Sequence, residues 1–96
     1  MKLQNMIKTL KAHKAELKRT FAVKTLGIFG SYARGEQTKK SDLDILAEFD
    51  VSPDFFQFVE LERHLSDFLG VKVDLVSKKG LKPIVSKQIQ KEVVAI

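Results

Sequence analysis

The hydrophobic and polar positions of this 96-residue chain follow two different periods, which divide it into helices and strands. Between residues 2 and 19 the apolar side chains recur every three or four positions and lysines fill the other face, which predicts an amphipathic helix. Val23–Phe29 is short, β-rich and too apolar for a surface strand. We therefore expect a buried strand that feeds a turn at Gly30.

Two further strands carry acidic residues where strands are usually apolar. In Leu43–Phe49 the alternate apolar residues share one face, and Asp42 and Asp44 fall on the other. Residues 71–76 alternate in the same way, with Asp74 on the polar face. Because aspartate is depleted in strand interiors, all three carboxylates need a chemical reason.

Two more helices are expected between and after these strands. Ser52 and Pro53 predict a helix start, with Ser52 as a possible N-cap and Pro53 at the first helical position, and Gly70 provides the stop. A last helix should follow Pro83 and end near the carboxyl terminus. The predicted inner faces comprise Phe55, Phe58, Val59, Leu61, Leu65, Phe68 and Leu69 in the first helix, and Ile84, Val85, Ile89 and Val93 in the second.

The resulting order is helix, strand, helical turn, strand, helix, strand, helix. This order predicts a small α/β fold of packed layers. The chain shows no internal repeat, low-complexity tract or linker, so we expect residues 1–96 to form a single domain.

Composition narrows the chemistry without assigning it. The absence of cysteine excludes disulfides, thiolate metal sites and a cysteine nucleophile. No segment approaches membrane-spanning length and the amino terminus does not resemble a secretory signal, so we expect a cytoplasmic protein with no membrane contact. The net charge of +5 suits a polyanionic partner such as a nucleotide or RNA, although most of the lysines are expected simply to be solvated.

The three aspartates are a candidate metal site. Asp42 and Asp44 should project from the same face about 6.5 to 7 Å apart along the strand, close enough to share a cation. Mg²⁺ takes carboxylate oxygens at about 2.0 to 2.1 Å, keeps several waters and completes its shell with substrate phosphates. Two such ions about 3.5 to 4 Å apart would stabilise the attacking and the leaving oxygens of a phosphoryl displacement.

The turn after the first strand fits the other half of such a substrate. Gly30 would let the backbone approach a phosphate, and Ser31 and the amides of the following helical turn could donate hydrogen bonds to a triphosphate. Arg34 lies one helical turn beyond Ser31 and could add a charge-assisted contact. Each of these features is also compatible with a purely structural role, as a tight turn, a helix cap or a solvated strand edge.

Together, these residues resemble a known family. Gly30 to Glu36, with the sequence GSYARGE, followed by SDLDI from Ser41 to Ile45, is similar to the signature of the minimal nucleotidyltransferases of the DNA polymerase β superfamily. Asp74 matches the family's third carboxylate. The resemblance covers nearly the whole chain and implies the nucleotidyltransferase fold, with a short mixed sheet packed against helices.

The resemblance also implies an activity and the residues that carry it. Gly30 and Ser31 would bind the triphosphate of ATP, Asp42 and Asp44 would bind two Mg²⁺ ions, and Asp74 would complete the catalytic metal site. Similar proteins are commonly encoded beside a HEPN-type RNase toxin and silence it by attaching AMP to a tyrosine. Arg34 is implied only as a phosphate or partner contact.

Three functions remain open from sequence. The leading hypothesis is transfer of AMP to a tyrosine of a HEPN toxin, and the second is nucleotidyl transfer to RNA or a small molecule, which the basic surface favours only slightly. The third is an antitoxin that binds its partner without catalysis. Larger relatives carry a second domain that holds the base and the acceptor, so here the acceptor must be presented by a partner protein or a second copy of the chain.

Overall fold

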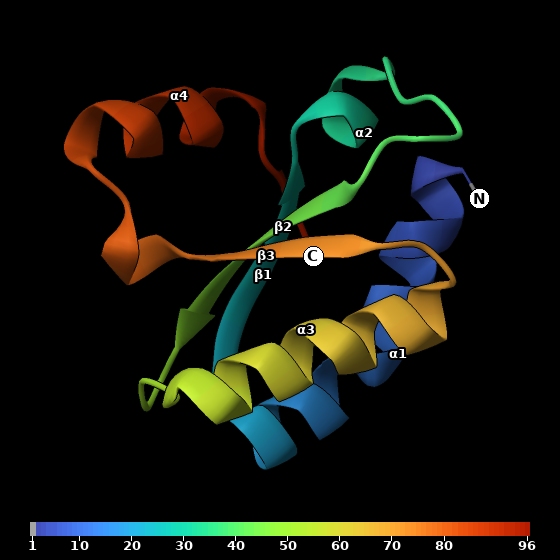
Figure 1. The fold of residues 1–96 in the computed structure, drawn as a ribbon. Coiled ribbons are helices and arrows are strands. Elements are labelled where there is room, and N and C mark those ends of the chain that lie inside the picture. Colours follow the sequence, from blue (N-terminus) through green and yellow to red (C-terminus); the bar gives the residue numbers. More distant parts are fainter. Residues whose placement is uncertain (1) are drawn as a thin grey trace.

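The computed structural model describes residues 2–96, which form a four-stranded mixed sheet and its covering helices (Figure 1). The elements follow in the order α1 (Leu3–Phe21), β1 (Val23–Phe29), α2 (Ser31–Arg34), β2 (Leu43–Phe49), α3 (Phe55–Leu69), β3 (Val73–Ser77), a 3₁₀ turn (Lys78–Gly80), α4 (Pro83–Glu92) and β4 (Val94–Ala95). The α/β fold class and the order of the first three strands are therefore confirmed.

The strands lie in the order β3-β2-β1-β4. β1 and β2 are antiparallel neighbours, whereas β2 and β3 are parallel and are joined by α3 as the crossover. In Figure 1, α1 and α3 lie together on one side of the sheet and α4 lies apart from them. This arrangement leaves the polar face of β2 and β3, which carries the aspartates, outside the α1–α3 layer.

The core fills the space between the sheet and the α1–α3 layer. It consists of apolar residues at helical spacing on the two helices and of the alternate apolar residues on the strands. The principal members are Met6, Leu10 and Leu17 of α1, Leu61, Leu65 and Leu69 of α3, and Ile28, Leu43, Ile45, Ala47, Val73 and Leu75 of the strands. Burial of these side chains is the main favourable contribution to folding, at roughly 1.5 to 3 kcal/mol for each large side chain.

The predicted start of the central helix is wrong by two residues. Asp54, not Ser52, is the N-cap: its carboxylate accepts a hydrogen bond from the backbone N–H of Gln57, and the Gln57 side chain accepts one from the N–H of Asp54. This reciprocal capping box satisfies two amides that would otherwise lack partners, and Ser52 could not form it because Phe55 would stand where the partner Glu or Gln is needed. Pro53 lies outside the helix.

The apolar stripe of α3 is narrower than predicted. Leu61, Leu65 and Leu69, at four-residue spacing, are fully buried, and Phe58 and Phe68 are half-buried against the same core. Phe55 and Val59, however, are 74% and 43% exposed, because they lie four residues apart to one side of the buried face. The prediction that the phenylalanines of this helix are core residues is therefore wrong for Phe55 and for Phe56, which is 80% exposed.

The carboxyl-terminal segment differs most from the prediction. The last helix ends at Glu92, and Val94–Ala95 form β4, which pairs with the outer edge of β1. Two consecutive β-branched valines favour a strand, and the free edge of β1 provides the hydrogen-bonding partner. Ile89 is buried as predicted, but Ile84 is 70% exposed and Val85 is also exposed. The third strand also begins two residues later than expected, at Val73.

No helix among residues 2–96 has both the length and the apolar character needed to cross a bilayer.

Candidate active site

The turn between β1 and α2 requires glycine. Gly30 has φ 75° and ψ −152°, a region of backbone space that is essentially restricted to glycine. The adjacent Phe29 pairs with Asp44 across the sheet, so the Asp44 carboxylate lies directly against Gly30. A Cβ atom added to Gly30 would lie 2.0 Å from Asp44 Oδ2. The Asp44 carboxylate can therefore occupy this position only because residue 30 has no side chain.

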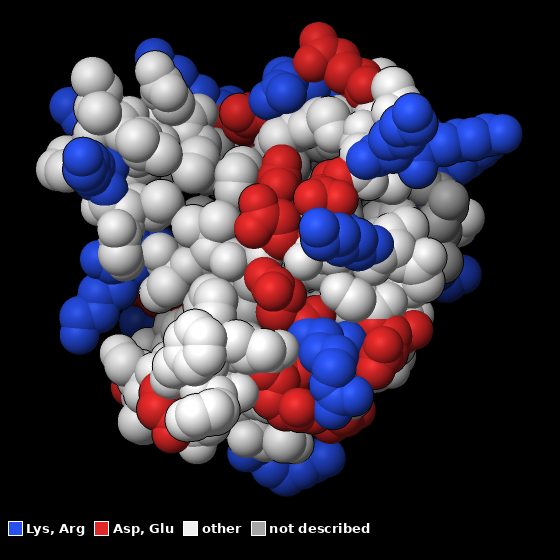
Figure 2. All heavy atoms as spheres, viewed as in Figure 1, with Lys and Arg blue, Asp and Glu red and all other residues white. Residues whose placement is uncertain are grey.

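The parallel register of β2 and β3 brings the predicted carboxylates together. Asp44 pairs directly with Asp74, and Asp42 stands two residues before Asp44 on the same face. Figure 2 shows the result as a group of acidic side chains in the middle of one face of the molecule, with basic side chains beside it. Asp42 and Asp74, which are 32 positions apart in the sequence, thus share one surface with Asp44.

Electrostatics at this surface favour a bound cation. The pKa of Asp44 is raised, first by burial and then by the negative charges of Asp74 and Asp42, while the charge of Arg34 opposes the shift. A divalent cation would relieve the same repulsion without protonation of any carboxylate, which is the usual role of a metal among clustered acids.

The donor set fits Mg²⁺ in its usual protein environment. Among residues 2–96, no three His, Cys, Asp or Glu side chains converge tightly enough to form a metal site unaided. Mg²⁺ does not need such a cage, because it keeps several waters and takes oxygens from substrate phosphates alongside one or two carboxylates. The Nζ of Lys72, a residue that is 81% exposed, lies 3.9 Å from Asp42 Oδ2. Such a loose, exposed ion pair is worth little and is readily replaced.

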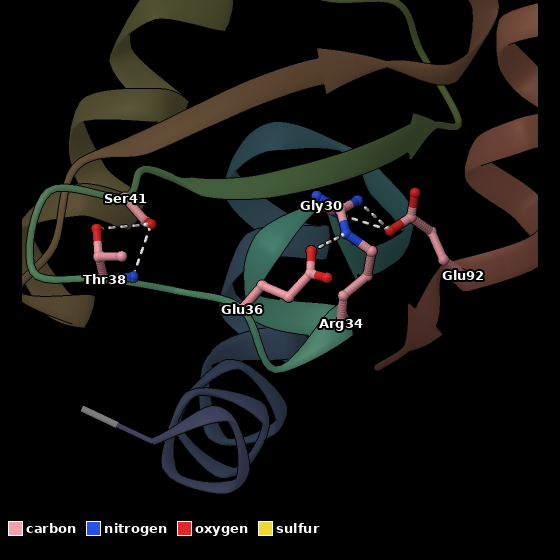
Figure 3. Close-up of polar contacts among 6 residues, drawn as sticks. All are labelled: Gly30, Arg34, Glu36, Thr38, Ser41 and Glu92. Atoms are coloured by element: carbon pink, nitrogen blue, oxygen red, sulfur yellow. Dashed lines mark hydrogen bonds and ion pairs between the residues drawn. The ribbon is translucent and has the colours of Figure 1, made fainter.

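Arg34 is held at the edge of the cluster by two glutamates (Figure 3). Its Nε donates to Glu36 Oε1 at 2.7 Å, and its Nη1 donates to Glu92 Oε2 at 2.8 Å. The same Glu92 oxygen accepts the backbone N–H of Gly30 at 3.2 Å. Glu36 and Glu92 thus both pair with Arg34, and the contact of Glu92 was not predicted. A single glutamate in a lysine-rich helix gives no sequence signal of this contact.

The strand that carries Asp74 is fixed from α3. Glu62 Oε2 accepts the backbone N–H of Leu75 at 2.8 Å, and Ser66 Oγ accepts that of Val73 at 3.0 Å. These are the two amides that flank Asp74, and they point away from β2 at the edge of the sheet. The two bonds satisfy an edge that would otherwise be open and set the direction of the Asp74 side chain.

Other conspicuous residues have structural roles. Tyr32 is buried in the core. His13 stacks on Phe68 with ring centroids 4.0 Å apart, and His64 lies 3.1 Å from Glu16, so both histidines belong to the contact between α1 and α3. Neither histidine takes part in the carboxylate cluster.

A family model described as a nucleotidyltransferase domain matches residues 10–96. The chain belongs to this family. The nucleotidyltransferase is 45% identical over 94 residues to the protein adenylyltransferase MntA of Thermococcus cleftensis, a match that covers 98% of this chain and 95% of MntA. The resemblance drawn from the sequence is therefore confirmed at the level of the family.

Solved structures support the same assignment. One described as a minimal nucleotidyltransferase superposes with a TM-score of 0.85 at 32% identity, covering 100% of this chain and 97% of the other. A toxin–antitoxin crystal structure with AMP-PNP gives a TM-score of 0.75 at 26% identity, covering 97% and 71%. A tri-AMPylated Shewanella oneidensis HEPN toxin in complex with MNT antitoxin gives 0.69 at 22% identity, covering 99% and 71%, and shares the fold.

The raised pKa of Asp44 predicts a pH-dependent stability difference. Because the folded protein holds the Asp44 proton more tightly than the unfolded chain, ionisation lowers stability as the pH rises from the ordinary aspartate pKa through the raised one. Asparagine cannot ionise, so in metal-free buffer Asp44→Asn should be more stable than wild type at neutral pH. The gain should vanish below the ordinary aspartate pKa. Urea unfolding across this range measures it, and a constant difference at every pH would contradict the prediction.

Proposed function

We propose that this nucleotidyltransferase transfers AMP from ATP to a tyrosine hydroxyl of a HEPN-type RNase toxin and so acts as an antitoxin. The observation that carries the proposal is the strand register, which places Asp44 opposite Asp74 and against Gly30. A nucleotide tail at the Gly30 turn would then lie beside three carboxylates. The similar proteins support the reaction and the acceptor, since one is named a protein adenylyltransferase and another is bound to an AMPylated HEPN toxin.

The proposed roles of the residues follow from their positions. Gly30 and Ser31 bind the triphosphate through the turn, and Arg34 contributes charge at its edge. Asp42 and Asp44 hold two Mg²⁺ ions, with Asp74 completing the catalytic site. When bound, these ions would neutralise the triphosphate and stabilise both the attacking and the leaving oxygens. ATP as the nucleotide is supported by the related toxin–antitoxin structure that contains AMP-PNP.

The reaction is a single displacement at the α-phosphorus. A bond forms from the tyrosine oxygen to the α-phosphorus, and the bond from that phosphorus to the bridging oxygen of pyrophosphate breaks. The hydroxyl proton leaves toward Asp74, which is exposed at the edge strand and open to an incoming side chain. The partner protein presents the acceptor, and the chain supplies the nucleotide site.

The decisive experiment follows label from ATP. The purified protein is incubated with Mg²⁺ and α-labelled ATP, with and without the product of the neighbouring gene, and with RNA in a parallel reaction. Asp42→Ala combined with Asp44→Ala is the inactive control. A metal-dependent adduct of AMP mass on the partner's tyrosine, lost in the double variant, is the expected result. Label in RNA alone would reassign the acceptor, and silencing of the partner by wild type and variant alike without transfer would indicate a binding antitoxin.

A further inference from the structure

The proposed triphosphate site already contains an anion supplied by the chain itself. The Glu92 carboxylate, at the end of α4, accepts the backbone N–H of Gly30 and pairs with Arg34 through the same oxygen, Oε2 (Figure 3). The Glu92 side chain is only 28% exposed, although Arg34 itself is 47% exposed. A carboxylate with one oxygen shared between a backbone amide and a guanidinium has the contacts that a phosphate oxygen would make.

The proposed function assigns these same two donors to the triphosphate. Each donor can direct its hydrogen at only one strong acceptor at a time, so ATP and Glu92 compete for the amide of Gly30 and the nearest face of Arg34. Two anions at one place also repel each other in a partly buried site. Full engagement of the triphosphate therefore requires Glu92 to move.

Movement of Glu92 would be transmitted to the carboxyl-terminal segment. Glu92 is the last residue of α4, and the chain passes directly into Val93 and β4. β4 is held to β1 by a short ladder, in which Gly27 pairs with Ala95 and Ile28 with Val94. Val93 packs on Gly27 so closely that no Cβ would fit there. The Glu92 contact joins this segment to the Gly30 turn, so losing it frees the end of α4 from the nucleotide site.

We propose that Glu92 is an internal counter-anion, which occupies the triphosphate donors in the nucleotide-free protein and is displaced by ATP, coupling nucleotide binding to release of α4 and β4. This inference rests on the proposed function, because it assumes that ATP binds at the Gly30 turn. Beyond the proposed function, it assigns Glu92 an effect on the affinity for the triphosphate. It also predicts that nucleotide binding loosens the carboxyl-terminal segment.

The first test measures nucleotide affinity in matched variants. Glu92→Gln keeps the shape but removes the competing charge, and it should bind MgATP roughly three- to tenfold more tightly than wild type. AMP lacks the β- and γ-phosphates, so its affinity should not change. Glu36→Gln is the control. Glu36 pairs with the same Arg34 as Glu92 does, but the Gly30 amide donates to Glu92 and not to Glu36. Calorimetric titration gives the dissociation constants, and thermal unfolding verifies that each variant is folded.

The second test follows the two segments directly. Hydrogen–deuterium exchange of the wild-type protein should slow at residues 30–35 and quicken at residues 83–96 when ATP is added, because Glu92 has left. In Glu92→Gln the faster exchange at residues 83–96 should already be present without nucleotide. Slower exchange at both segments on addition of ATP would overturn the proposal.

The failures of the two proposals can be told apart. In one outcome, the wild type binds ATP and transfers AMP while Glu92→Gln binds ATP no more tightly than Glu36→Gln does. That result would refute the counter-anion role of Glu92 and leave the proposed transferase function unaffected. A decrease in ATP affinity in Glu92→Gln would also refute it, since Glu92 would then support Arg34 instead of competing for it. If the wild type binds no nucleotide at all, both proposals fail together.

Discussion

Asp44→Asn is expected to reduce AMP transfer by roughly three orders of magnitude, the equivalent of about 4 kcal/mol of lost transition-state stabilisation. Asp44 is the central member of the cluster: it lies against Gly30, pairs with Asp74 in the sheet and follows Asp42 on the same face. Asparagine keeps the shape but removes the negative charge that would hold Mg²⁺ beside the reacting phosphate. Initial rates with α-labelled ATP and the partner protein measure the loss.

Asp67→Asn is the matched control for this substitution. Asp67 is an exposed residue of α3, with a side chain 68% exposed and only a 4.0 Å ion pair to Arg63. Its replacement makes the same chemical change away from the cluster and should leave transfer within about twofold, because exposed ion pairs contribute little. If Asp44→Asn retained more than a tenth of wild-type activity while still folded, Asp44 would not be a metal ligand, and the assignment of the cluster would have to change.

Asp44→Asn therefore has opposite expected effects on stability and on activity. Without metal, the wild-type carboxylate is held beside Asp74 and Asp42 at a cost that asparagine avoids. With metal and nucleotide, the same charge becomes the source of catalysis. Functional sites commonly reduce stability in this way. The variant separates the two effects because both are measurable on one folded protein.

The three carboxylates of the cluster could be recognised in the sequence because the signals that mark them are local. Aspartate is so unfavourable inside a strand that Asp42, Asp44 and Asp74 were conspicuous, and alternation put each on the polar face of its strand. What alternation could not give was the pairing of Asp44 with Asp74, because register depends on contacts between strands far apart in the chain. The resemblance to a family supplied that relation before the structure did.

The carboxyl-terminal segment shows where local signals fail. Helical spacing extended to Val93, and only the open edge of β1 makes Val94 and Ala95 a strand. The position of Glu92 depends on this end of the helix, because a longer helix would not place the Glu92 carboxylate at the Gly30 amide. At the start of α3 the expected cap was Ser52, and the reciprocal bonds between Asp54 and Gln57 make Asp54 the cap instead. For β4 and Glu92 the deciding partner is distant in the chain, whereas the capping box of Asp54 and Gln57 is a local pattern.

Gly30→Ala should damage both the fold and the site. A non-glycine residue at φ 75° and ψ −152° costs about 1 to 3 kcal/mol in backbone strain alone. The new Cβ would also lie 2.0 Å from Asp44 Oδ2, so either the turn or the carboxylate has to shift. A displacement of about 1 Å at a reacting centre can reduce a rate by roughly 100-fold. Urea unfolding and AMP-transfer rates on the same preparation measure the two effects.

Gly70→Ala separates the backbone strain from the collision. Gly70 also has a positive φ, 71°, at the end of α3, but a Cβ there meets no atom within 4 Å. Gly70→Ala should therefore lose about 1 kcal/mol of stability and keep its transfer activity, because the left-handed conformation alone disfavours alanine. Gly30→Ala should lose more stability and most of its activity. Equal losses of stability in the two variants, with activity retained in both, would show that the Asp44 carboxylate can move aside and that the turn does not fix its position.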